Sequence, residues 1–179
     1  IDKPKTQHGK VCFAFTKLGR YMLDNGEGWV VTSDNLLTER DPEKLHFSVL
    51  PDGGTGIRNP AFGSVQEEHN LVPLDGDGLF CVCRLNELTP AQSVSRDGGH
   101  TWSLPARMTY GPGARTFKQP RANAKLFQTS DGRYLFWFHN HSGSSFENRN
   151  TAFLSGGSLQ ADGFIHWSEP ELLLFDPDV

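Results

Sequence analysis

Residues 95–102 read Ser-Arg-Asp-Gly-Gly-His-Thr-Trp, and this octet predicts both a tight turn and the residue that anchors it. Asp97 can accept hydrogen bonds from backbone amides across the turn, while Gly98 and Gly99 can adopt the positive φ angles that such a turn requires. Trp102 is expected to pack the turn onto an underlying sheet. Burying an indole removes roughly 200 Å² from water, which contributes at most about 5 kcal/mol. The octet therefore predicts a corner in an antiparallel β-structure.

Weaker copies of this corner lie on either side of it along the chain. Ser33 follows a strand-like run, and so does Ser155. Two apolar runs joined by an Asp-Gly turn precede each of the later corners, at residues 70–83 and 123–138. The repeating unit is thus strand, Asp-Gly turn, strand, strand, corner, strand, with a period of about 60 residues. Four antiparallel strands in this order are typical of one blade of a β-propeller.

The chain length then sets the number of blades. The 179 residues predict one partial β-propeller domain with blades over residues 1–60, 61–115 and 116–179, the first of them lacking its innermost strand. Closed propellers need about four to eight blades, and three would leave two open flanks. We therefore expect this chain to be part of a longer polypeptide that supplies the remainder of the propeller. The alternative is that a second copy closes the fold.

Composition excludes several classes of function. The formal net charge is −4 and no basic cluster occurs, so no nucleic-acid partner is expected. No apolar run approaches the roughly 18 residues of a membrane span. His139 and His141 share one face of a strand but lack a third ligand, so neither a metal nor another cofactor is predicted. The three cysteines are expected to be small buried hydrophobes.

The pattern Ser-x-Asp-x-Gly-x-Thr-Trp, carried by Ser95, Asp97, Gly99 and Trp102, resembles the Asp-box, also called the bacterial-neuraminidase repeat. The chain is in this respect similar to sialidase-like β-propellers. The resemblance implies an all-β fold of four-stranded antiparallel blades, with about half of a six-bladed propeller in this chain. It implies no chemistry by itself, because the Asp-box is a blade corner.

Charged residues enter the predicted strands where a propeller would expose them to its central funnel. Glu68 and Arg121 occupy matching places ahead of the two Asp-Gly turns. Arg84 ends one apolar run and Arg149 opens another. An arginine beside a buried strand needs a partner for its charge. Several arginines that converge favour a carboxylate or a phosphate, which the planar guanidinium binds in a bidentate manner.

The resemblance to sialidases assigns roles to these residues. Glu68, or Glu67 with a shift of one residue, is similar to the glutamate that activates a tyrosine nucleophile. Arg84 and Arg149 resemble the second and third arginines that hold the sugar carboxylate, while the first arginine, the acid/base aspartate and the tyrosine have no counterpart here. For the parent protein this implies retaining hydrolysis of a terminal, sialic-acid-like sugar from a glycan. Such an acidic glycan is the expected partner, and Arg121 and His69 are further candidates to contact it.

Other interpretations of the same residues stay open. A polysaccharide lyase acting on uronates would use His69, His139 or His141 as its base. A propeller that only binds glycans or proteins would have no active site, because fold does not determine function. Carbohydrate-active propellers usually work outside the cytoplasm, so a secreted or periplasmic location is expected, although no targeting signal is visible.

Structural explanations also compete for each charged residue. Arg84 would then form an ion pair with Glu67 or Glu87, and Glu68 would be a solvated acid at a strand end. Arg149 would be a loop residue beside Glu147. The arginine in Ile57-Arg58-Asn59-Pro60 resembles a sialidase phrase only superficially, since it comes one blade too late.

Overall fold

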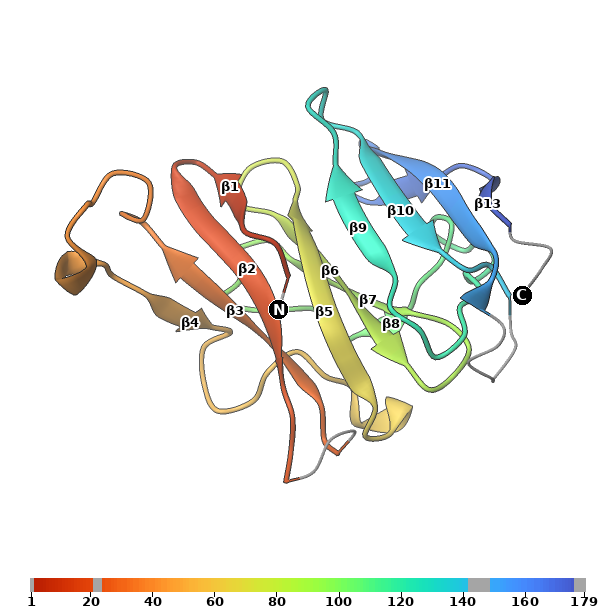
Figure 1. Cartoon of the computed structure of the whole chain (residues 1–179), viewed down its shortest axis with the longest axis horizontal. Helices are drawn as coiled ribbons and strands as arrows, with labels where there is room; N and C mark the ends of the chain where they lie inside the picture. The colour runs from red at the N-terminus through yellow and green to blue at the C-terminus, as the bar shows by residue number, and fades with distance from the viewer. Residues whose placement is uncertain (1, 21–23, 142–148, 176–179) are drawn as a thin grey trace.

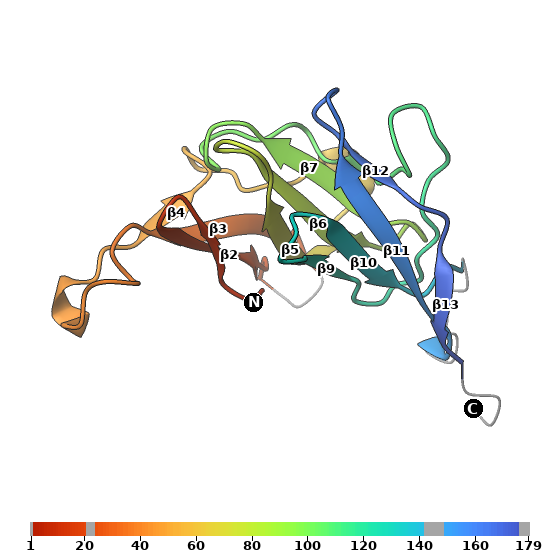
Figure 2. The same cartoon turned by 90° about the horizontal axis from the view of Figure 1, so that it is seen from above.

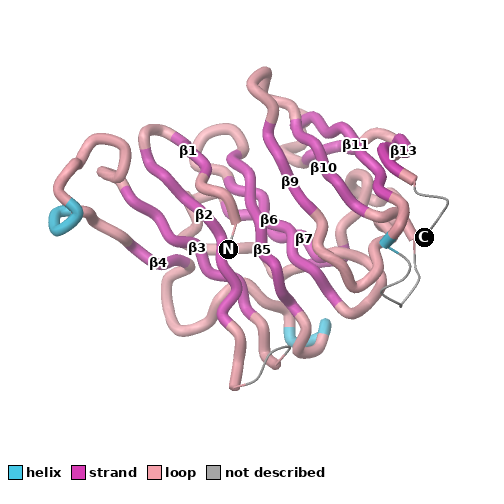
Figure 3. The backbone as a smooth tube through the Cα atoms, viewed as in Figure 1, coloured by secondary structure: helices cyan, strands magenta, loops and turns pink. Residues whose placement is uncertain are grey.

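The chain folds into three antiparallel sheets that lie side by side, in sequence order from the N-terminus to the C-terminus (Figure 1). This computed structural model describes residues 2–20, 24–141 and 149–175. Strands dominate these residues, with short 3₁₀ turns such as η1 (Pro42–Lys44) and η2 (Pro60–Phe62) (Figure 3). None of the described helical segments is long and apolar enough to cross a membrane. The predicted all-β class is confirmed.

Each sheet is one blade, formed by consecutive strands. Blade 1 contains β1 (Lys5–Gln7), β2 (Lys10–Lys17), β3 (Glu27–Ser33) and β4 (Ser48–Leu50). Blade 2 contains β5 (Gln66–Pro73), β6 (Leu79–Leu85), β7 (Ala91–Ser95) and β8 (Ala106–Arg107). Blade 3 contains β9 (Lys125–Gln128), β10 (Tyr134–Phe138), β11 (Ala152–Leu159), β12 (Ile165–Trp167) and β13 (Glu171–Leu174). Strands β12 and β13 pair with opposite ends of β11, so together they form the outer edge of this blade. The structure thus confirms the predicted all-β fold class, with sheets of consecutive antiparallel strands like the blades of a propeller.

Blade 1 differs from the prediction that it lacks its innermost strand. Strand β1 is present and pairs with β2 from Lys5 opposite Cys12 to Gln7 opposite Lys10. A turn at His8 and Gly9, with φ angles of 48° and 78°, joins the two strands. The sequence pattern missed β1 because its three residues are partly exposed or exposed and carry no apolar alternation.

The middle blade is buried on both faces because side chains alternate along its strands. From β6, Leu79 and Cys81 join an apolar cluster shared with blade 1. Phe80 and Val82 join a larger cluster shared with blade 3. All three cysteines are buried and free, as predicted. Viewed from above, blade 1 with β2, β3 and β4 lies on the left, β6 and β7 of blade 2 lie in the middle, and β11, β12 and β13 of blade 3 lie on the right (Figure 2).

One polar residue occupies the same place in each blade. In blade 1 it is Asp2, whose N–H donates to the carbonyl of Ala14. In blade 2 it is Asn70, three residues ahead of the β5 residue (Pro73) that lies across β6 from the corner serine. In blade 3 it is Asn123, likewise three residues ahead of the β9 residue (Leu126) that lies across β10 from Ser155. Asp2 Oδ2 accepts the Leu71 N–H at 2.9 Å, and Asn70 Oδ1 accepts the Leu126 N–H at 2.9 Å. Both bonds are buried, and each links one blade to the inner strand of the next.

The octet forms the corner between β7 and β8. Asp97 accepts hydrogen bonds from the N–H and the hydroxyl of Thr101 at 2.9 and 2.6 Å, and Ser95 Oγ accepts the Gly99 N–H at 2.8 Å. The Thr101 bonds lower the pKa of Asp97 to about 2. Trp102 packs on the blade 1–2 cluster and donates its indole N–H to Gly99, but it is only half-buried. Its anchoring contribution is therefore smaller than full burial would allow.

Candidate functional site

The predicted charged residues lie at one end of the blades. Strand β5 begins, β6 ends and β11 begins at this end, because neighbouring strands are antiparallel; it is the lower edge in Figure 1. Glu67 and Glu68 are at the start of β5 and Arg84 is at the end of β6. Arg121 lies in the connection that leads into β9, and Arg149 lies just ahead of β11. We refer to this end of the molecule as the arginine face.

Arg84 is held between two glutamates. Its Nη2 pairs with Glu67 Oε2, and its Nη1 lies 3.2 Å from Glu68 Oε1. The exposed fractions of the side chains are 15% for Arg84, 7% for Glu67 and 33% for Glu68, so solvent reaches mainly Glu68. The ion pair of Arg84 with Glu67, one of the structural explanations, is therefore present. Glu87 instead pairs with Arg107.

Glu68 has an unusual backbone conformation. Its φ is 54°, and the pairing of β5 with β6 shifts between Glu67 and Asn70, which marks a bulge. The Asn70 amide donates to the Glu68 carbonyl at 3.1 Å and supports this geometry. A residue other than glycine in the left-handed region of backbone conformation costs on the order of 1 kcal/mol. Bulges with such strain occur often beside functional sites, where they redirect a side chain.

Three atoms of this cluster are buried without a hydrogen-bond partner: Glu67 Oε1, Glu68 Oε2 and Arg84 Nε. Buried polar atoms are normally paired, since an unpaired one costs about 1–3 kcal/mol. The cluster thus contains polar atoms that the described residues leave unpaired, and Glu68 is the member whose side chain is most exposed, at 33%. A polar ligand would meet the cluster at Glu68.

Arg149 and Arg121 form a second group at the same end. Arg149 Nη2 donates to the Arg121 carbonyl at 2.7 Å, and both side chains are half-buried. Gln119 shapes the loop here, because its side chain accepts the His139 N–H at 2.8 Å and donates to the Ala122 carbonyl at 3.1 Å. Glu147, the suggested neighbour of Arg149, lies outside the described residues.

His69 is placed apart from the arginines. Its ring packs against Gly28 of blade 1, and Nδ1 lies 2.9 Å from the Thr16 hydroxyl. Only 3% of the residue is exposed. Burial lowers the pKa of His69 to about 4, so the imidazole is neutral near pH 7. Its position is that of a packing residue between blades 1 and 2.

The histidines considered for a lyase or a metal are also constrained. His139 is buried, and its Nδ1 lies 2.6 Å from the Thr151 carbonyl. Burial lowers the pKa values of both His139 and His141. Within the described residues, no group of three or more histidine, cysteine or acidic side chains could hold a metal ion.

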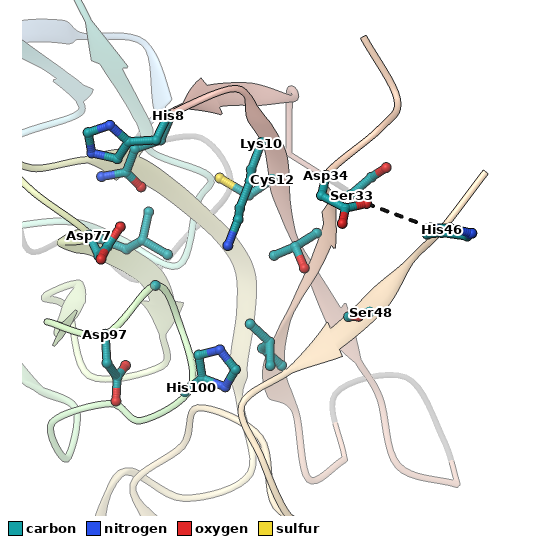
Figure 4. A pocket seen from close by; sticks show the side chains of 15 residues that line it. His8, Lys10, Cys12, Ser33, Asp34, His46, Ser48, Asp77, Asp97 and His100 are labelled. Atoms are coloured by element: carbon teal, nitrogen blue, oxygen red, sulfur yellow. Dashed lines mark ion pairs between the residues drawn. The ribbon is translucent and has the colours of Figure 1, made fainter. Parts of the chain in front are cut away.

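Sequence reasoning missed two features. Arg58, which it set aside, lies in the connection that leads to β5, and its Nε is buried without a partner. A cavity of about 390 Å³ lies between blades 1 and 2 at the opposite end of the strands (Figure 4). The turns that form it are far apart in the sequence, so no local motif signals it.

Comparison with one solved structure supports the fold. The chain matches no protein-family model and no curated protein. It is similar to a solved structure described as the endo-1,4-beta-xylanase from Bacteroides thetaiotaomicron VPI-5482, at a TM-score of 0.57 and 14% identity, over 97% of this chain and 59% of that one. Trypanosoma rangeli sialidase in complex with sialic acid is a more distant match, at a TM-score of 0.35 and 12% identity, over 86% of this chain and 36% of that one. The chain thus spans less than two thirds of either structure's length.

Proposed function

We propose that this chain is part of a sialidase-like propeller glycosidase whose arginine face binds a terminal acidic sugar. The observation that carries this proposal is the cluster of Glu67, Glu68 and Arg84, with its strained bulge and its unpaired buried atoms. A scaffold has no need for a strained bulge or for unpaired buried polar atoms, because each of these costs free energy. The resemblance of the octet to an Asp-box supports the same family.

Each residue has a distinct role in this proposal. Arg84, oriented by Glu67, holds the sugar carboxylate through the remaining N–H groups of its guanidinium, and Arg149 provides a second positive charge. Glu68 is the more accessible acid and activates the nucleophile, a tyrosine supplied by the rest of the propeller. A neutral nucleophile suits an anionic sugar, because a carboxylate would repel it. The sugar is released with retained configuration through a covalent intermediate.

The flank of blade 3 supports the proposal that more blades follow. Asn123 occupies the place of Asp2 and Asn70, which bond the next blade, but its Oδ1 is buried and has no partner. On the outer edge of the same blade, Leu172, Leu173 and Leu174 are each more than half exposed. A further four-stranded blade, from the remainder of the propeller, would donate a backbone N–H to Asn123 and cover apolar surface.

The lyase alternative finds less support. His69 and His139 are 3% and 5% exposed, so neither imidazole can reach a substrate without rearrangement, which leaves the half-buried His141 as the candidate base. The main alternative is a propeller that binds glycans without cleaving them. A measurement of turnover beside one of binding distinguishes this binding propeller from a glycosidase.

The first test is titration of the chain with N-acetylneuraminic acid by calorimetry. Arg84→Ala should weaken binding by about 10- to 100-fold, the value of one charge-assisted contact. Arg133→Ala is the matched control, because this exposed arginine pairs with Asp131 in the β9–β10 turn at the other end of the blades. Equal binding by both variants would overturn the assignment of Arg84.

The second test is hydrolysis of a fluorogenic aryl sialoside by the protein with its complete propeller. Release of the fluorophore that falls at least tenfold in Glu68→Gln supports the glycosidase. Binding without release would indicate a binding propeller. An unsaturated uronate product from a polyuronate would instead indicate a lyase.

A further inference from the structure

The cavity between blades 1 and 2 is separate from the arginine face. Its walls are the β1–β2 turn, the end of β3, strand β4, the β5–β6 turn and the corner turn after β7 (Figure 4). Strand β6 begins at this cavity with Leu79, and Arg84 lies near its other end. At about 3.3 Å per residue, the five residue steps from Leu79 to Arg84 separate the two places by roughly 17 Å.

Hydrogen bonds hold the walls of the cavity in place. Gln7 Nε2 donates to the carbonyls of Leu74, Gly76 and Gly78, which ties the β1–β2 turn to the β5–β6 turn. The Gly98 N–H donates to the Asp77 carbonyl at 2.8 Å and ties the corner turn to the same place. The cavity is therefore preorganised, which lowers the entropic cost of binding.

The polar groups of the cavity are available for a ligand. Lys10 extends its ammonium into the cavity, with Asp77 on one side and His100 below (Figure 4). Neither the Lys10 ammonium nor the Asp77 carboxylate makes a hydrogen bond or ion pair with any described residue. The hydroxyls of Thr32 and Ser48 add groups that both donate and accept.

The floor and the charge of the cavity narrow the class of ligand. Cys12, Leu50 and Leu79 provide a buried apolar floor, suited to the C–H face of a sugar ring. Burial raises the pKa of the Cys12 thiol to about 11, so this cysteine is neutral and adds no charge. One lysine and three aspartates (Asp34, Asp77 and Asp97) line the cavity, which disfavours a polyanion, and the ammonium of Lys10 inside the cavity disfavours a cation.

We propose that this cavity binds a neutral saccharide, with Lys10 donating to its hydroxyl groups and Asp77 accepting from them. A cavity of about 390 Å³ lies within the range of small-molecule sites and has room for one or two sugar rings. The site does not depend on the proposed function, because it uses none of the residues of the arginine face. A glycan-acting protein would gain a second point of attachment to the neutral part of a glycan.

The test is calorimetric titration of the chain with three neutral disaccharides, cellobiose, lactose and xylobiose, beside glucuronic acid as an anionic probe. We expect at least one disaccharide to bind, and Lys10→Ala and Asp77→Asn each to weaken it at least tenfold. Lys118→Ala, which removes an exposed lysine outside the cavity, should bind as the unmodified chain does.

Three results would overturn the proposal. One is that none of the disaccharides binds at millimolar concentration. Another is that Lys10→Ala and Asp77→Asn, verified as folded by circular dichroism, bind as tightly as Lys118→Ala. The third is that Arg84→Ala abolishes disaccharide binding, which would move it to the arginine face. If the unmodified chain binds a disaccharide but does not bind N-acetylneuraminic acid, the proposed function alone is refuted.

Discussion

Lowering the pH should destabilise this protein through one buried histidine. The pKa of His69 is lowered from 6.5 to about 4, chiefly because burial between blades 1 and 2 removes its ring from water. The Ile57 carbonyl nearby offsets only part of this effect and already accepts the Gly28 N–H. In the unfolded chain the same ring binds a proton near pH 6.5. The unfolded state therefore gains a proton first as the pH falls.

The magnitude follows from linkage between proton binding and folding. A histidine whose pKa is lower in the folded state contributes stability above pH 6.5, and this contribution is lost between pH 6.5 and pH 4. With these two pKa values, the free energy of unfolding falls by about 2 kcal/mol from pH 7 to pH 5. That amount is a large part of the stability of an ordinary domain.

Urea unfolding at pH 7, 6 and 5, followed by tryptophan fluorescence, measures this loss. The His69→Gln variant has no ring that can bind a proton at this position. Between pH 7 and pH 5 its free energy of unfolding should therefore fall by about 2 kcal/mol less than that of the unmodified chain. His100→Gln is the matched control, because His100 is exposed on the corner turn. A loss that is the same in the unmodified chain and in His69→Gln would refute the reasoning, because carboxylates would then account for all of it.

Two further predictions concern the bonds that join and shape the blades. Asn70→Ala should lower the free energy of unfolding by about 1–3 kcal/mol, because it leaves the buried Leu126 N–H unpaired, whereas Asn123→Ala should cost much less in this chain. Equal losses in the two variants, measured by urea unfolding, would contradict the bonding scheme between blades. Asp97→Ala should destabilise the chain by about 1 kcal/mol through loss of its bonds to Thr101, a modest value because the carboxylate is exposed. Thermal unfolding of Asp97→Ala at pH 7 measures this, and an unchanged midpoint would show that the turn needs no such bonds.

The fold could be predicted from sequence because its signals are local. The apolar run 79–83 became β6, the apolar run 134–138 became β10, and an Asp-Gly turn precedes each. Turn chemistry and side-chain alternation act over a few residues, so they can be read without knowing what packs against them. Strand β1 escaped prediction for the same reason, since it is held by its partner strand rather than by its own composition.

The candidate site could be predicted only in part. The sequence indicated that Glu68 and Arg84 would lie near each other, and the structure brings them to 3.2 Å. The sequence also suggested two roles for Glu67, either as the activating glutamate in place of Glu68 or as the ion-pair partner of Arg84. A bulge, which no local pattern signalled, now lets both glutamates reach the same guanidinium. His69, one residue away, faces blade 1 for the same reason.

The sequence by itself determined the repeating unit of this protein, its corner turn and the strand that each charged residue follows or precedes. These features depend on backbone propensity and on the two-residue period of a strand, which neighbouring residues set. Only the tertiary structure decided that His69 is buried beside Thr16, that Asn70 joins two blades and that Lys10 faces Asp77 across a cavity. Such contacts join residues far apart in the chain, so they depend on the register of the strands and on how the blades pack.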